Sequence, residues 1–245
     1  MRHFHEQLDE LFQQLVLMGS TAESMIRTAV RSLMEQNESL ADEVYTLEHE
    51  LNVLQVEVDD KAVRLTSLQQ PVARDARFLF MASRIGGELE RIGDQAINIC
   101  QNTHYVLVGG PPVKPLVDLT IMCEVVQTMV RNSVTAMVNR DVAMAEAVLH
   151  EEEKVDAFRD QVFRILLTHM MADPRTIAQC LSLILIGRNL ERIGDHATNI
   201  AEEVIYWRNG RDIRHQHAQK RLRPGEGAMD PQTITEDPAA SPDGR

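Results

Sequence analysis

Apolar residues recur at intervals of three and four positions almost without interruption from about His3 to Trp207. This period is that of amphipathic helices, and proline or glycine interrupts it at only a few places. The pattern predicts an all-α protein of six long helices, over about residues 3–36, 39–69, 71–105, 116–139, 142–170 and 175–207.

The chain also contains an internal duplication. Residues 89–99 and 190–200 are identical at nine of eleven positions and lie 101 residues apart. The features around them repeat in the same order: a long helix, an acidic helix, a proline turn and the helix with the duplicated segment. We therefore predict two tandem homologous three-helix bundles, residues 1–110 and 111–208. Residues 209–245 are predicted to be a basic patch and a disordered tail.

Charge and cysteine usage narrow the class of protein. With 37 acidic and 25 basic residues the net charge is −12, which disfavours nucleic acid as a partner. No apolar run approaches the roughly 20 residues that span a bilayer, so we expect no direct membrane insertion. Cys100, Cys123 and Cys180 are well separated and lack CxxC spacing, as expected of reduced, buried thiols in a cytoplasmic protein.

Each copy of the duplicated segment carries two carboxylates and an amide at a spacing of four, which places them on one helix face. These residues are Glu90, Asp94 and Asn98 in the first copy and Glu191, Asp195 and Asn199 in the second. The apolar seam of the same helix lies about 140° away, so this stripe is predicted to face away from its own core. The preceding acidic helices offer matching residues, namely Glu48 and Asn52 in the first bundle and Glu152 and Asp156 in the second.

Facing stripes on adjacent helices would form a groove lined by oxygen atoms. Oxygen ligands suit hard cations such as Mg²⁺, Mn²⁺ or Ca²⁺, and carboxylates also hold iron or zinc. The second groove has Asp156 where the first has Asn52, so the residue types favour the second. His196 points about 100° away from Asp195 and is not counted as a ligand. The Glu-x-x-His pattern of di-iron bundles is absent, which disfavours an oxidase.

Two other interpretations remain open. Arginines lie three residues from acids of the stripes, at Arg91 and Asp94, Arg188 and Glu191, and Arg192 and Asp195. Local ion pairs of this kind contribute about 0.2–0.5 kcal/mol each, so the stripes could be ordinary solvated surfaces of a structural bundle. Alternatively, the grooves could serve a metal-dependent enzyme.

Glycines recur on the same helices, one heptad apart. They are Gly86 and Gly93 in the first copy and Gly187 and Gly194 in the second. Glycine inside a helix costs about 1 kcal/mol relative to alanine, so the repetition indicates a close approach to the backbone. Either a neighbouring helix or a cation cluster would account for it.

With these residues in hand, the chain resembles the PhoU family of bacterial phosphate-transport accessory and regulatory proteins over about residues 3–207. The resemblance rests on Gln70-Pro71-Val72-Ala73-Arg74-Asp75 with Arg77-Phe78, on the duplicated Leu-Glu-Arg-Ile-Gly-Asp, and on Asp195-His196-Ala197-Thr198-Asn199-Ile200-Ala201-Glu202. It implies two homologous three-helix bundles, often assembled as a homodimer.

The resemblance also implies metal binding by Glu/Asp-x-x-x-Asp motifs on the protein surface. These motifs fall on Glu90 and Asp94, on Glu191 and Asp195, and on Glu152 and Asp156, with Glu48 in the first bundle. Asn98 and Asn199 come next on their stripes. The implied cofactor is a divalent or trivalent metal, among them Mg, Mn, Zn or Fe.

The function implied by the resemblance is that of a regulator without catalytic activity. Such a protein would couple the phosphate ABC transporter, through its ATPase subunit, to a sensor histidine kinase. It would thereby modulate phosphate uptake and repress the phosphate-starvation response. The residues agree, because the sequence has no P-loop, no Gly-rich phosphate cradle and no nucleophile paired with a base.

Overall fold

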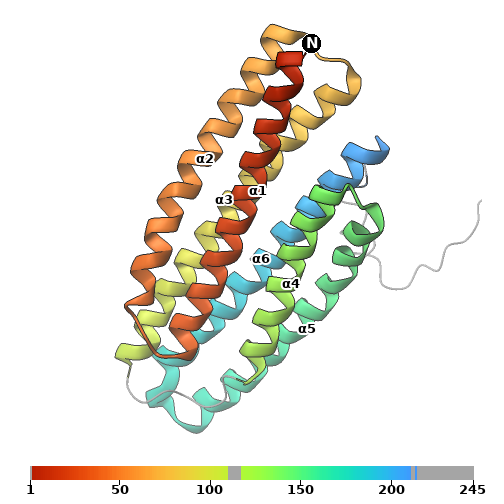
Figure 1. The fold of residues 1–245 in the computed structure, drawn as a ribbon. Helices are drawn as coiled ribbons and strands as arrows, with labels where there is room; N and C mark the ends of the chain where they lie inside the picture. Colours follow the sequence, from red (N-terminus) through yellow and green to blue (C-terminus); the bar gives the residue numbers. More distant parts are fainter. Residues whose placement is uncertain (1, 110–116, 211–212, 214–245) are drawn as a thin grey trace, which may run out of the picture. The chain divides into compact units, whose positions relative to one another are not determined.

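The fold is taken from a computed structural model, which describes residues 2–109, 117–210 and 213. The helices, in chain order, are α1 (Arg2–Met34), α2 (Leu40–Gln69), α3 (Ala73–Val108), α4 (Val117–Asn139), α5 (Val142–Ala172) and α6 (Ile177–Asn209) (Figure 1). A short 3-10 turn, η1 (Pro174–Thr176), precedes α6, and these described ranges contain no strand. The predicted all-α class is confirmed. None of the described helices is long and apolar enough to span a membrane.

The six helices form one compact unit, within which the two copies of the duplication can be followed. Helices α1, α2 and α3, which we call the first half, all contact one another, as do α4, α5 and α6, the second half. The halves meet where α3 packs along α6 and α1 along α4 (Figure 1). The predicted boundary between bundles falls on residues 110–116, which lie outside the described residues, as does almost all of the predicted tail.

Side chains and backbone conformation at the turns set the helix ends. The Asp141 carboxylate accepts a hydrogen bond from the Met144 N–H at 3.0 Å and so caps the start of α5. At the other end of the second half, α6 stops at Gly210, whose φ of 66° is left-handed and easily adopted only by glycine. The turn η1 was not predicted. It forms because Asp173 accepts from the Arg175 N–H just after the end of α5.

The predicted apolar seams are the centre of the core. Every seam residue is at most 1% exposed, namely Ile85, Leu89, Ile92, Ala96 and Ile99 on α3 and Ile186, Leu190, Ile193, Ala197, Ile200 and Val204 on α6. The three cysteines are buried and free, as predicted. Burial of these seams fixes how α3 and α6 are rotated about their own axes, and this rotation determines where the acidic stripes lie.

The repeated glycines face the neighbouring helix of their own half, which answers the question that the sequence left open. A Cβ atom on Gly93 would lie 2.6 Å from Leu51 Cδ2, and one on Gly194 would lie 3.5 Å from Val155 Cγ1. Gly86 and Gly187 face Val58 and Val162 in the same way, at 3.4 and 3.7 Å. Each position of α2 therefore corresponds to the position of α5 that is 104 residues later in the chain.

Candidate metal-binding grooves

The residues assigned to the first groove form a polar cluster between α2 and α3, which pack against each other. Glu48 and Asn52 line it from α2, and the Asn52 amide donates to Glu48 Oε1 at 2.6 Å. Burial, followed by the charge of Glu48, raises the pKa of Asp94 on α3. Burial, followed by the charge of Asp94, raises the pKa of Glu90. The three carboxylates are therefore close enough to repel one another.

The second groove, between α5 and α6, has the corresponding arrangement with one more carboxylate. Burial raises the pKa of Asp195 to about 6, and the next largest causes are the charges of Glu191, Glu152 and Asp156. The structure thus brings together the four acids that the sequence assigned to this groove. A shift of this size means that ionising Asp195 costs free energy, first because the side chain is partly buried and then because acids lie beside it.

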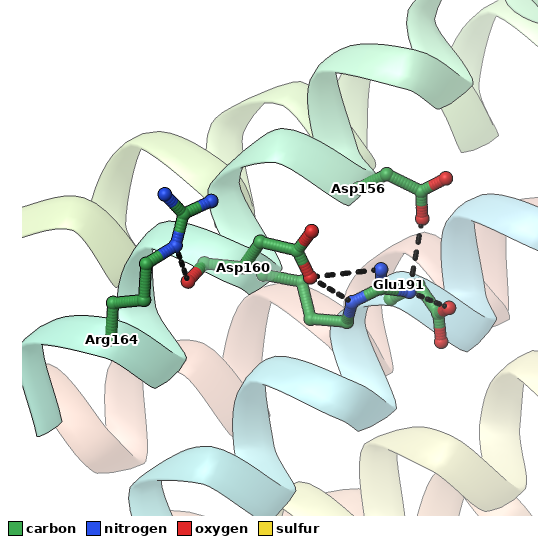
Figure 2. A network of polar contacts seen from close by, with 5 residues as sticks. Asp156, Asp160, Arg164 and Glu191 are labelled. Atoms are coloured by element: carbon green, nitrogen blue, oxygen red, sulfur yellow. Dashed lines mark hydrogen bonds and ion pairs between the residues drawn. The ribbon is translucent and has the colours of Figure 1, made fainter. Parts of the chain in front are cut away.

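An arginine that the sequence reasoning missed reaches into the second groove. The Arg159 guanidinium donates through Nη1 to Asp156 Oδ1 at 3.1 Å and to Glu191 Oε1 at 2.6 Å. It also donates through Nη2 to Asp160 Oδ1 at 3.0 Å. Figure 2 shows Asp156 and Asp160 on α5 and Glu191 on α6 around this network. Arg159 therefore joins the two helices across the groove.

The groove opens beside these groups into a cavity of about 490 Å³. Its lining includes Arg159, Glu191 and Asp195, together with Arg188 and Arg192 from α6. Both signs of charge meet on its wall. Arg159 could have been noticed in the sequence, because it lies three residues after Asp156 and therefore on the same helix face.

The local ion pairs considered from the sequence do not form among the described residues. Arg91 donates to Glu88 at 3.0 Å rather than to Asp94, and Glu191 pairs with Arg159 of α5 rather than with Arg188. Arg192 makes no ion pair with Asp195. The three ion pairs named from the sequence are therefore absent from the described part of the chain, although Arg91 with Glu88 and Arg159 with Asp156 form other pairs of the same three-residue spacing.

The two asparagines of the stripes have hydrogen-bond partners other than the acids of their grooves. The Asn199 amide donates to Glu88 Oε2 of α3 at 2.9 Å, across the contact between the halves. Within the described residues the Asn98 side chain makes no hydrogen bond to these acids, and its main-chain carbonyl accepts from Asn102. Their assignment as metal ligands stays a prediction.

Glu88 is the centre of a polar cluster between α3 and α6. His196 Nδ1 lies 2.8 Å from Glu88 Oε2, and both side chains are mostly buried. Burial alone would raise the pKa of Glu88, but the hydrogen bonds from His196 and Asn199 hold it below its usual range. This cluster was not predicted, although the rotation of His196 away from Asp195 was.

The chemistry of both grooves suits a metal ion, although no ready-made site is visible. Carboxylates that lie close enough to repel one another gain from a cation placed between them. However, in the described part of the chain no three His, Cys, Asp or Glu side chains converge as metal ligands do. Asn52 and Arg159 engage carboxylates in the first and second groove respectively, so side-chain rearrangement must accompany binding of a metal.

Comparison with known proteins places these grooves in a family. The model of the family described as "PhoU domain" matches the chain twice, over residues 15–103 and 119–204. This chain belongs to the PhoU family. It is 36% identical over 228 residues to the phosphate-specific transport system accessory protein PhoU homolog of Zymomonas mobilis, covering 93% of this chain and 96% of the relative.

Further relatives agree with this assignment. The homolog of the same description from Pseudomonas putida is 35% identical, covering 87% of this chain and 84% of the relative. The crystal structure of PhoU from Pseudomonas aeruginosa covers 85% of this chain and is itself covered fully, with 33% identity and a TM-score of 0.82. The regulatory protein PhoU from Streptococcus pneumoniae, at 21% identity and a TM-score of 0.78, shares the fold; the alignment covers 86% of this chain and 99% of that one.

The motif that first indicated the PhoU family has a structural role at the start of α3. Gln70 ends α2 with a left-handed φ of 43°, and α3 begins at Ala73. Phe78 then packs between Phe12 of α1 and Trp207 of α6, with ring centroids 6.3 and 5.4 Å apart. This PhoU-family segment therefore helps to hold the two halves together. It lies nearer the start of α3 than the acidic stripe does.

Proposed function

We propose that this chain is a metal-binding adaptor that couples the phosphate ABC transporter to a sensor histidine kinase and represses the phosphate-starvation response. The proposal is carried by one observation, namely two matched acidic grooves in a chain of the PhoU family. Its relatives are named accessory proteins of the phosphate-specific transport system, which supports an adaptor over an enzyme. In this role the chain acts in the cytoplasm as a homodimer, contacts the transporter's ATPase subunit and modulates phosphate uptake.

In this proposal each groove holds divalent or trivalent metal, with Mg, Mn, Zn and Fe as the candidates. The ligands are Glu152, Asp156, Glu191 and Asp195 in the second groove and Glu48, Asn52, Glu90 and Asp94 in the first. Asn98 and Asn199 would complete the stripes. The bound metal would supply the positive charge that these carboxylates lack.

Metal analysis of protein purified without chelator tests this part of the proposal. We expect metal in the full chain, about half of it lost in Glu191→Ala/Asp195→Ala and the rest lost when Glu90→Ala/Asp94→Ala is added. A matched control is Glu146→Ala/Glu153→Ala, which removes two exposed acids of α5 and should leave the metal content unchanged. Equal metal content in all variants would overturn the site assignment.

The adaptor role needs a separate measurement. We expect the tagged chain to co-purify with the transporter ATPase and with the kinase from cells grown in abundant phosphate. Deleting the gene should raise expression of phosphate-starvation genes under the same conditions. Absence of both partners at high and at low phosphate would count against the adaptor.

A further inference from the structure

The strongest feature outside the acids themselves is the side chain of Arg159. Its guanidinium contacts carboxylates on both walls of the second groove, Asp156 on α5 and Glu191 on α6. The side chains of Asp156 and Glu191 are 28% and 18% exposed, and that of Arg159 is 34% exposed, so water screens the interaction only in part. A charged donor in such a setting is a strong competitor for any other cation.

The first groove has no such side chain. Positions of α2 and α5 correspond because Leu51 and Val155, and likewise Val58 and Val162, face equivalent glycines. By this correspondence, Gln55 stands where the second half has Arg159. Gln55 donates to Asp59 of its own helix, away from Glu48 and Asn52. The two grooves therefore differ by a full positive charge at one equivalent position.

Arg91 of α3 acts on the first groove through its nearby charge, which partly offsets the rise in the pKa of Glu90 caused by burial and by Asp94, and not through a hydrogen bond to the carboxylates of the groove. Arg91 corresponds to Arg192 of α6, and its guanidinium is taken up by Glu88 in the contact between the halves. Among the described residues, the hydrogen bond that reaches the carboxylates Glu48, Glu90 and Asp94 from a side chain of the groove is the one from the Asn52 amide to Glu48. A neutral amide is displaced by a metal ion more easily than a guanidinium that makes charged hydrogen bonds.

We propose that Arg159 is a built-in counter-ion that competes with metal in the second groove, so that the first groove fills at lower metal concentration. This inference rests on the proposed metal binding. It reverses the order that residue types alone suggested, because the extra carboxylate of Asp156 is already paired with an arginine. The two grooves then respond to different ranges of metal concentration.

The test uses Mn²⁺ as the probe and the Arg159→Gln variant, which gives the second groove the residue found in the first. To isolate the second groove, the full chain carries Glu90→Ala/Asp94→Ala, and Mn²⁺ affinity is measured by calorimetric titration. We expect Arg159→Gln to tighten Mn²⁺ binding about tenfold or more, since charged hydrogen bonds no longer have to be broken. The control is Arg164→Gln, since Arg164 lies on the same helix and, among the described residues, donates to the main-chain carbonyl of Asp160 rather than to an acid of the groove (Figure 2).

A mirror variant keeps the test decisive if Arg159→Gln folds poorly. Gln55→Arg, in a chain carrying Glu191→Ala/Asp195→Ala, places an arginine in the first groove and should weaken Mn²⁺ binding there by a similar factor. Equal affinity in Arg159→Gln and Arg164→Gln, or no effect of Gln55→Arg, would overturn the role of Arg159 while leaving metal binding intact. Absence of Mn²⁺ binding from the unmodified chain and from every variant would instead refute the metal proposal on which this one rests.

Discussion

At the scale of single residues, the behaviour of the grooves depends on carboxylates held close together. Asp195 is the clearest case, because its folded-state pKa is about 6 against 3.8 for a free side chain. Between about pH 4 and pH 6 the folded chain retains a proton that the unfolded chain has released. The contribution of Asp195 to stability therefore falls as the pH rises through this window, and the full penalty is present above it.

Replacing Asp195 by asparagine should remove this penalty. In the presence of a chelator we expect Asp195→Asn to raise the free energy of unfolding by about 1 kcal/mol at pH 8, a value discounted for partial exposure to solvent. The gain should disappear below about pH 4, where both states are protonated. Urea unfolding at the two pH values measures it, with the exposed Asp60→Asn as control, and a gain that does not depend on pH would contradict the assigned cause.

The acids of the grooves were predictable from sequence, whereas their partners were not. A spacing of four puts Glu191 and Asp195 on one helix face whatever the tertiary structure, so the stripe could be predicted. The choice of Arg159 over Arg188 as partner of Glu191 depends on how α5 is rotated against α6. Arg91 pairs with Glu88, three residues before it on the same helix, where spacing alone left Asp94, three residues after it, as an equal candidate. Such choices are set by packing between helices, which a pattern along one helix does not contain.

At the scale of elements, the helices were predictable because one rule determines them. Burial of a seam with 3.6-residue period fixes each long helix, and turns with Pro71, Asp141 and Pro174 separate consecutive helices. The ends were less accurate: α3 begins at Ala73 rather than at Pro71, and α6 is preceded by the turn η1. These details depend on single hydrogen bonds, such as the one that Asp173 accepts from the Arg175 N–H.

The repeated glycines give a prediction at this scale, because equivalent positions differ in their surroundings. Gly194→Ala meets only ordinary contacts, the nearest at 3.5 Å, and should stabilise the chain by about 0.5–1 kcal/mol through helix propensity. Gly93→Ala would place its methyl group 2.6 Å from Leu51, which is fully buried, and should cost about 1–3 kcal/mol. Chemical unfolding of both variants measures the two changes.

Gly87, a third glycine of these helices, serves as the control for this comparison. A Cβ atom on Gly87 would meet nothing within 4 Å, so Gly87→Ala should be stabilising like Gly194→Ala. If Gly93→Ala and Gly194→Ala change the free energy of unfolding by the same amount, the close contact of Leu51 with Gly93 does not make alanine unfavourable there.

At the scale of the whole described chain, polar and aromatic contacts join α3 to α6. Glu88 accepts from His196 and Asn199, Arg84 pairs with Glu203 at 2.9 Å, and Phe78 packs on Trp207. Because these contacts cross between the halves, we expect the halves to unfold together. Trp207, the single tryptophan, reports on that contact by fluorescence, and its transition should coincide with the loss of helix measured by circular dichroism.

Glu88 is the residue whose removal should weaken this contact most directly. Glu88→Ala leaves the mostly buried His196 without its partner and removes the acceptor of the exposed Asn199 amide, so we expect a loss of about 1–3 kcal/mol in the free energy of unfolding. Since the pKa of Glu88 is held below its usual range, its contribution is present above that range and is lost as the pH falls through the lowered pKa. The difference between the variant and the unmodified chain should therefore shrink below about pH 4, the ordinary range of a glutamate.

Glu50→Ala, an exposed acid of α2, is the control and should change stability by less than about 0.5 kcal/mol. A loss in Glu88→Ala no larger than that of Glu50→Ala would mean that apolar packing alone holds α3 against α6.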